Sequence, residues 1–337
     1  MTDLAQPTDV PPRFDYVALF EAHRRPLTGY CYRMLGSIHE AEDAVQESMV
    51  RAWRSVDRLD GPDSVKPWLY RIATNVCLTM LGGRRRRALP MDLVEASSGD
   101  TKTGVPLAES TWVQPVPDAR VMAPGDDPAE RTVARESIRL AFVAALQYLP
   151  ARQRAVLILR DVLRWRAAEV AELLDTTVVS VNSALRRARV AIAERASAPA
   201  PAVADADQEV LLERYIDAFE RFDVERLVAL LHEDVVLAMP PHDLWLQGHA
   251  AIRRFFAADP GCRMHRFAVT TANGAPAVGA YRPTGPDGEY EAFALQVLEM
   301  SAGRITAIHA FLDPALFPLF DLPASLPTAP WIRRKVD

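Results

Sequence analysis

Residues 165–192 read WRAAEVAELLDTTVVSVNSALRRARVAI, and this stretch decides the fold of its region. It contains two short amphipathic segments separated by the polar break DTT. In the second segment apolar residues recur at spacings of three and four, which predicts one buried stripe along a helix. They are Val181, Leu185, Ala188 and Ile192. Thr176 or Thr177 can cap that helix by accepting its free N–H groups. The stretch therefore predicts a helix-turn-helix.

The other face of the second predicted helix carries the residues expected to meet DNA. A recognition helix enters the major groove with its N-terminal side chains at the base edges. Asn182 suits a contact to adenine, and arginines suit contacts to phosphates. The expected DNA-binding residues of this helix are Val178, Val179, Asn182, Arg186, Arg187 and Arg189. From the pattern alone, an ordinary helical hairpin with a solvated arginine face remains an alternative.

The composition indicates a soluble chain with two differently charged halves. The 337 residues carry a net charge of −5. Residues 201–337 hold 12 Lys and Arg against 19 Asp and Glu, whereas residues 1–200 hold 27 against 25. We find no apolar run of about 18 residues and no N-terminal signal peptide, which predicts a cytoplasmic protein without a membrane segment. The three cysteines, Cys31, Cys77 and Cys262, lack metal-type spacing, so we expect free thiols and neither a metal nor a cofactor.

Composition also divides the chain into segments. Residues 14–90 and 129–196 have helical periodicity, while 91–128 and 197–207 are rich in Pro, Gly, Ala or Ser and are predicted to be linkers. A helical stretch opens residues 208–323, and five strand-like runs follow before a short tail, 324–337. The runs lie at 235–239, 266–273, 276–283, 290–300 and 304–312, and Asn273-Gly274 and Pro286-Asp287-Gly288 between them predict hairpin turns. The predicted fold is therefore multidomain, with two all-α domains followed by an α+β domain.

Residues 148–192 resemble region 4 of bacterial RNA polymerase sigma factors, and most closely the extracytoplasmic-function group of the sigma-70 family. The family pattern is present as Leu149-Pro150, Arg154 and Arg187-Ala188-Arg189 around the helix-turn-helix. The resemblance implies that residues 129–196 read the upstream promoter element. The partners it implies are core RNA polymerase, through its β′ and β subunits, and promoter DNA.

A second resemblance lies in HEAEDAVQESMVRAWR (39–54), which looks like the family's polymerase-docking helix. Its spacing places Ala44, Val45, Met49 and Ala52 toward a core. The outer face is polar and acidic, which suits a basic protein partner and repels DNA. The expected polymerase-binding residues are Glu40, Glu42, Asp43, Gln46 and Glu47. A merely solubilising charged face is the alternative.

Residues 66–87, KPWLYRIATNVCLTMLGGRRRR, are similar to the family's helix that melts the downstream element and captures a flipped base. Aromatic rings offer stacking faces to single-stranded DNA, and an arginine cluster neutralises its backbone. The expected DNA-binding residues here are Trp68, Tyr70, Arg71, Asn75, Arg84, Arg85, Arg86 and Arg87. An aromatic ring at a helix start also suits a core, so Trp68 has two interpretations.

The linker and the C-terminal block distinguish this chain from minimal sigma factors. The linker contains TWVQPVPDARV (111–121), whose Trp112, Pro115, Pro117 and Asp118 suggest a segment that docks. The block at 208–323 resembles SnoaL-like domains, a cone-shaped α+β fold, and the resemblance implies a regulatory domain. A small-molecule ligand or a protein regulator at this domain stays open. A pocket would be lined by Trp245, Phe255, Phe293 and Phe311.

The predicted function is that of a sigma factor modulated by its own C-terminal domain, and not an enzyme. Two alternatives remain at this stage: an enzyme or ligand-binding protein acting through the C-terminal domain, and a conventional helix-turn-helix repressor. Candidate catalytic residues are His232, Asp234, His242, His265, His309 and Asp313, which form no recognisable dyad in the sequence. The acidic helix at 39–54 argues against the repressor, which would not need it.

Overall fold

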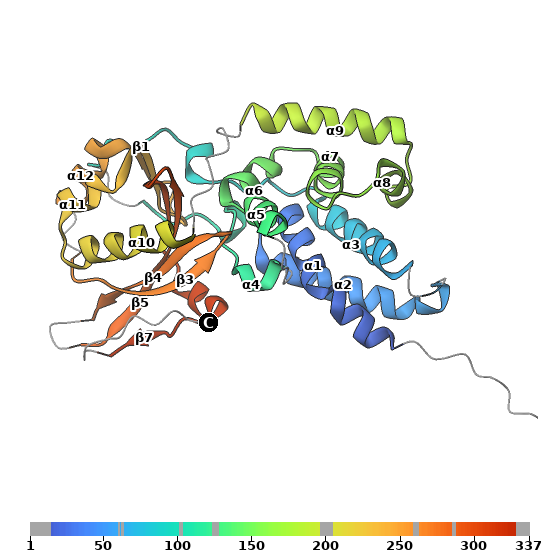
Figure 1. Ribbon diagram of the computed structural model, residues 1–337, viewed down its shortest axis with the longest axis horizontal. Coiled ribbons are helices and arrows are strands. Elements are labelled where there is room, and N and C mark those ends of the chain that lie inside the picture. Colours follow the sequence, from blue (N-terminus) through green and yellow to red (C-terminus); the bar gives the residue numbers. More distant parts are fainter. Residues whose placement is uncertain are drawn as a thin grey trace, which may run out of the picture.

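The computed structural model describes residues 15–59, 61, 64–100, 104–122, 128–195, 205–258, 263–284 and 288–327. Two groups of helices lie on one side of the molecule and an α/β layer lies on the other, with the linker between them (Figure 1). We call these parts the first helical domain (15–87), the linker (88–122), the second helical domain (128–195) and the tail domain (205–327). Cys262, the Pro286–Asp287 turn and most of the predicted segments 197–207 and 324–337 lie outside the described residues.

The first helical domain contains α1 (Tyr16–Leu35), α2 (Ile38–Arg54) and α3 (Val65–Leu81). Gly36 ends α1 in the left-handed conformation, and Ser37 caps α2 by accepting the N–H of Glu40. The predicted core face of α2 is confirmed, with Ala44, Val45 and Ala52 buried. The helix α3 ends before Gly82, as the glycine pair predicts.

The second helical domain contains five α-helices: α5 (Pro128–Glu136), α6 (Leu140–Gln147), α7 (Ala151–Leu157), α8 (Ala167–Leu173) and α9 (Val178–Ala193). A π-helical turn at Ile158–Val162 continues α7. Thr177 caps α9 and accepts the N–H of Ser180, and the predicted stripe of α9 is buried at Val181, Leu185 and Ala188. The helix-turn-helix is therefore confirmed.

The tail domain contains α10 (Asp205–Glu220), α11 (Val224–Ala229) and α12 (Gly248–Ala258) against one sheet. The sheet order is β2-β1-β6-β5-β4-β3, with β7 paired to β5. Its strands are β1 (Leu231–Ala238), β2 (Trp245–Gln247), β3 (Arg266–Ala272), β4 (Ala275–Pro283), β5 (Tyr290–Ser301), β6 (Arg304–Phe311) and β7 (Ser325–Leu326). The five predicted strand runs are confirmed as β1 and β3 to β6, whereas the short β2 and β7 were not predicted.

The two faces of this sheet belong to different cores. Phe267, Val278 and Leu298 pack on the face covered by the tail helices. Ala268 and Val297 lie in a continuous apolar cluster that also contains the cores of both helical domains and the linker. The tail domain is therefore packed against the helical domains, and the sheet is covered on both sides.

The linker has short structured pieces and follows the surface of both other layers. It contains 3₁₀ turns at Pro90–Asp92 and Glu109–Thr111 and the single helical turn α4 (Asp118–Val121). Its Ser97 N–H donates to the carbonyl of Trp245 on β2, and the Trp245 indole N–H donates to the carbonyl of Val94. Trp112 is 3% exposed and Pro115 and Pro117 are buried, so this segment of the linker packs against the rest of the molecule.

Candidate functional site

The outward face of α9 is exposed at every position that the sequence assigned to DNA. Val179 is 75% exposed and Val178 is 42% exposed, next to exposed Asn182, Arg186 and Arg187. The remaining one, Arg189, is also exposed but forms a two-point ion pair with Asp161 at 2.7 and 2.8 Å. The helix contains no Asp or Glu, so its outer face is positive with an apolar N-terminal end.

Some residues of α3 that were expected to meet single-stranded DNA are exposed, and others are covered by neighbouring side chains. Arg71 and Asn75 are exposed, and Arg71 donates to the carbonyl of Glu172 at the end of α8. Tyr70 is not accessible to DNA in this conformation: its side chain is 2% exposed and packs on Trp165, with the ring centroids 5.1 Å apart. Trp68 is half-buried against Phe20, which leaves part of its ring accessible.

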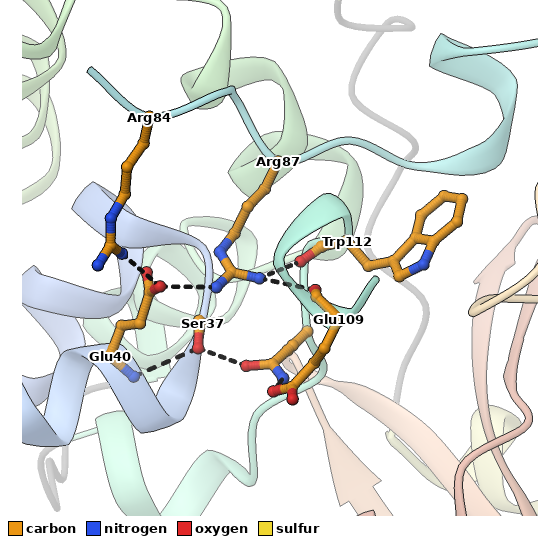
Figure 2. A network of polar contacts seen from close by, with 7 residues as sticks. Ser37, Glu40, Arg84, Arg87, Glu109 and Trp112 are labelled. Atoms are coloured by element: carbon orange, nitrogen blue, oxygen red, sulfur yellow. Dashed lines mark hydrogen bonds and ion pairs between the residues drawn. The ribbon is translucent and has the colours of Figure 1, made fainter. Parts of the chain in front are cut away.

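The arginine cluster after α3 is also divided (Figure 2). Arg87 is buried, donates to the carbonyls of Glu109 and Trp112 at 3.0 and 2.8 Å, and pairs with Glu40 at 2.9 Å. Its donors are therefore not available to DNA in this conformation, since the linker carbonyls and Glu40 occupy them. Arg84 pairs with the same Glu40 from an exposed position.

The other two arginines of the cluster, Arg85 and Arg86, are exposed. The Arg86 guanidinium lies 4.1 Å from the centre of the Tyr148 ring, and that of Arg195 lies 4.3 Å from it. This stacking joins the end of the first helical domain to the turn between α6 and α7 and to the C-terminal end of the second helical domain.

The acidic face of α2 is present, with its members in different environments. Asp43 and Gln46 are exposed, and Glu47 is exposed and paired with Arg51 at 2.7 Å. By contrast, Glu40 is held by the arginine cluster, and Glu42 lies 3.5 Å from Arg120 of the linker. The part of this face that neither the arginine cluster nor the linker covers is therefore centred on Asp43, Gln46 and Glu47, and we call it the free part of α2.

A groove of about 290 Å³ between α1 and α2 extends this face and was not predicted. Val50 and Trp53 lie on its rim, one and two turns beyond Gln46, and Trp53 is 57% exposed. Val17 on α1 is also exposed beside them. The exposure of an apolar side chain depends on what the neighbouring helix covers, so the periodicity of α2 alone did not indicate the groove.

The turn between β3 and β4 joins all parts of the molecule. Asn273 and Gly274 have φ of +55° and +71°, and Asn273 is buried. The Asn273 side chain accepts from the N–H of Val116 at 2.9 Å and donates at 2.7 Å to both the Tyr32 hydroxyl and the Ile138 carbonyl. Its backbone N–H donates to the Val116 carbonyl at 3.0 Å. One residue of the tail domain therefore holds the linker and both helical domains.

Gly274 of the same turn is held by a close approach and by a hydrogen bond. A Cβ at Gly274 would lie 2.7 Å from the carbonyl oxygen of Arg135, so glycine is needed for close approach as well as for its φ. The N–H of Gly274 donates to Asp118 at 2.7 Å. Burial raises the pKa of Asp118 to about 6, although this hydrogen bond and the charge of Arg135 oppose the rise. The sequence predicted the hairpin turn here but not its interdomain role.

The two helical domains also contact each other directly. Buried Arg33 on α1 donates to the Ser137 carbonyl at 3.1 Å and to its hydroxyl at 2.6 Å. The motif residue Arg154 on α7 donates to the carbonyl of Met34. Burial lowers the pKa of each arginine to about 10. These contacts hold the exposed face of α9 and the acidic face of α2 in one fixed arrangement.

The candidate catalytic residues of the tail domain do not converge. His232 and Asp234 are exposed, Asp313 caps a 3₁₀ turn, and buried His265 stacks on Phe219 with centroids 5.7 Å apart. His309 does have an unpredicted partner, because its Nε2 lies 3.6 Å from the Glu299 carboxylate. That pair extends from the sheet face that the helical domains cover, since Val297 pairs with His309 in the sheet. The His309–Glu299 pair therefore lies in the packed layer between the sheet and the helical domains, and not on the sheet face that the tail helices cover.

The pocket expected in the tail domain is not formed by the four aromatic residues proposed for it. Phe255 and Phe293 pack on the face of the tail helices, while Phe311 belongs to the opposite face. Trp245 lies at the sheet edge and contacts the linker. Between α10, α11 and α12 a space of about 10 Å³ remains, room for at most one water. The prediction of this lining is wrong, because the four aromatic residues lie on two different faces and at the edge of the sheet. Their residue type alone does not indicate which face each one is on.

Neither a metal cluster nor a membrane span is found in the part of the chain that the structure describes. No group of three or more His, Cys, Asp or Glu residues there is arranged to hold a metal ion. No helix there combines the length and the apolar character that crossing a membrane requires.

Three family models match the chain in the order of its parts. They are Sigma-70 region 2 over residues 19–87, Sigma-70 region 4 over 139–192, and the SnoaL-like domain over 212–308. The ECF RNA polymerase sigma factor SigG of Mycobacterium tuberculosis (strain ATCC 25618 / H37Rv) is 46% identical over 330 residues, covering 93% of this chain and 85% of that protein. The chain belongs to the ECF RNA polymerase sigma factors. As one of them it binds core RNA polymerase and directs promoter-specific initiation of transcription.

Two further comparisons separate the sigma factor's common parts from its tail domain. The ECF sigma factor SigW of Bacillus subtilis (strain 168) is 28% identical over 177 residues, covering 52% of this chain and 86% of that protein. The crystal structure of the Mycobacterium tuberculosis ECF sigma factor SigJ matches with a TM-score of 0.59 and 24% identity, covering 91% of this chain and 100% of that one. At that identity the likeness establishes the fold of this sigma factor, tail domain included.

Proposed function

We propose that this sigma factor is regulated by its own tail domain, which holds the chain in a closed form. The closed form is the arrangement in which Asn273 binds Val116, Tyr32 and Ile138. This observation carries the proposal, because one buried turn joins the linker and both promoter-reading domains. Promoter reading requires the two helical domains to reach separate DNA elements, so the closed form must open first. A ligand or partner that binds the open form more tightly would shift the population toward it.

The proposed polymerase-docking surface is the free part of α2. It joins Asp43, Gln46 and Glu47 to the apolar rim at Val50 and Trp53, all on one side of the helix. An acidic patch beside an exposed tryptophan suits a basic partner with an apolar contact at its centre. We assign this partner to the β′ subunit of the core enzyme. Glu40 would act after Arg84 and Arg87 release it, and Glu42 after Arg120 of the linker does.

The proposed promoter-reading surfaces are the outer face of α9 and the exposed side of α3. Arg186 and Arg187 would contact phosphates and Asn182 an adenine in the upstream element. Arg71 and Asn75 would meet the downstream element with the accessible part of Trp68. Tyr70 and Arg87 would become available once the closed form opens, since Trp165 and the linker cover them. The tail domain would have no catalytic role, and the chain would work in the cytoplasm beside the polymerase.

Replacing Trp53 by alanine is expected to raise the Kd for core polymerase roughly tenfold to thirtyfold, as loss of an exposed aromatic anchor does at protein interfaces. Fluorescence titration of labelled sigma factor with core enzyme measures it. Met264→Ala is the matched control, because Met264 is 53% exposed on the tail domain, away from α2. An unchanged Kd for Trp53→Ala would remove this surface from the proposal.

A chain ending at Arg195 tests the regulatory role of the tail domain. It ends with the last described residue of the second helical domain and lacks the whole tail domain. We expect it to give several-fold more run-off transcript per holoenzyme than the full chain, on the same promoter and core polymerase. Val210→Ala in the full chain is the control, since Val210 is exposed on α10. Equal yields from the full and shortened chains would show that the tail domain does not regulate initiation.

A further inference from the structure

The N-terminal end of α9 exposes two apolar side chains that the fold does not use. Val178 and Val179 are the first two residues of the helix and are 42% and 75% exposed. Valine is a poorer helix former than alanine, and neither side chain contributes to the buried stripe. Folding therefore gives no reason for two adjacent valines at this position.

The surroundings of the two valines restrict the ligand. On the helix they lie on the same side as Asn182 and Arg186, within about one third of its circumference. The helix carries three arginines and no acidic residue, so this face is complementary to a polyanion. In a helix-turn-helix the first residues of the second helix are the ones that reach base edges. The one apolar group that a base presents in the major groove is the C5 methyl of thymine.

We infer that Val178 and Val179 read thymine methyl groups in the upstream promoter element. This inference rests on the proposed promoter contact of α9 and adds its specificity. It assigns thymine to positions next to the adenine that Asn182 contacts, because Asn182 follows one turn along the same face. Burying one methyl group contributes about 0.8 kcal/mol, which corresponds to about fourfold in Kd.

The experiment uses holoenzyme formed from the full chain and core RNA polymerase. Duplexes randomised over the upstream and downstream elements are bound, recovered and sequenced to obtain the preferred upstream element. That element is then synthesised with each thymine replaced in turn by deoxyuridine, which pairs identically and lacks only the methyl group. Kd values are measured for wild type, Val178→Ala, Val179→Ala and Val190→Ala. Val190 is the matched control, a valine on the same helix that is 55% exposed beyond the base-reading end.

The inference predicts at least one thymine whose replacement weakens wild-type and Val190→Ala holoenzyme about fourfold. The same replacement should have no further effect in Val178→Ala or Val179→Ala, because the valine that contacts the methyl is gone. Two results would overturn it: deoxyuridine tolerated at every position by the wild type, or an equal loss in all four proteins. If the selection enriches no upstream element at all, the promoter contact proposed for α9 fails together with the inference.

Discussion

Replacing Asn273 by alanine is expected to loosen the closed form by about 3 kcal/mol. The side chain makes three hydrogen bonds to three different parts of the molecule. Its loss leaves the buried Val116 N–H and Ile138 carbonyl without this partner, while the Tyr32 hydroxyl keeps its hydrogen bond to the Gln114 carbonyl. Each unsatisfied buried polar group costs about 1–3 kcal/mol. A change of 3 kcal/mol shifts the ratio of closed to open molecules about a hundredfold. Hydrogen exchange of the Val116 amide should accelerate by a similar factor.

Asn182→Ala is the matched control for this experiment, since Asn182 is exposed on α9 and contacts neither the linker nor the tail domain. Its exchange at Val116 should equal that of the wild type. Amides in the centre of β5 report whether the tail domain itself stays folded. Protection of Val116 that persists in Asn273→Ala would show that the apolar contacts alone hold the closed form.

Acidification is expected to strengthen the closed form through Asp118. The pKa of this carboxyl rises from 3.8 to about 6 on burial, so the closed form binds its proton more tightly than the open form does. The cost of burying the charge is fully present above about pH 6 and disappears as the pH falls toward 4. Two units at 1.36 kcal/mol each give about 2–3 kcal/mol of added closure across this window. Promoter affinity of the free chain should fall in parallel.

Asp118→Asn should remove this pH dependence and favour closure at pH 7.5, because the amide oxygen still accepts the N–H of Gly274 without burying a charge. Asp92→Asn is the control, a carboxylate of the same linker that binds Tyr148 instead of the tail domain. Comparing wild type with Asp118→Asn isolates the Asp118 carboxyl, because every other titratable side chain is the same in both proteins. The same pH profile in wild type and Asp118→Asn would assign the effect to another group.

Local patterns in the sequence predicted those features that depend on a single element. The stripe of α9, its threonine cap and the strand runs of the tail domain follow from spacing and turn residues, which act over a few positions. The burial of Tyr70 and Arg87 was not predicted, for a different reason. Their types suit DNA, but each is covered by a residue far away in the chain, Trp165 and Trp112 respectively.

The role of the linker was predicted in part. A tryptophan followed by two prolines indicated docking, and Trp112 is 3% exposed. Which surface receives it could not be predicted, because Asn273 and Gly274 look like any hairpin turn. Their interdomain contacts arise from the way the sheet packs, and no local periodicity encodes that packing. The groove beside Trp53 was missed for the same reason.

The distance between the two helical domains reports whether the closed form opens before initiation. Spin labels at position 25 on α1 and position 190 on α9, both exposed, report it without disturbing the proposed contacts. We predict one short distance in the free chain, and a longer one when the same labelled chain is bound with core polymerase on a promoter. An unchanged distance in a transcribing complex would contradict the account, because initiation would then proceed from the closed form.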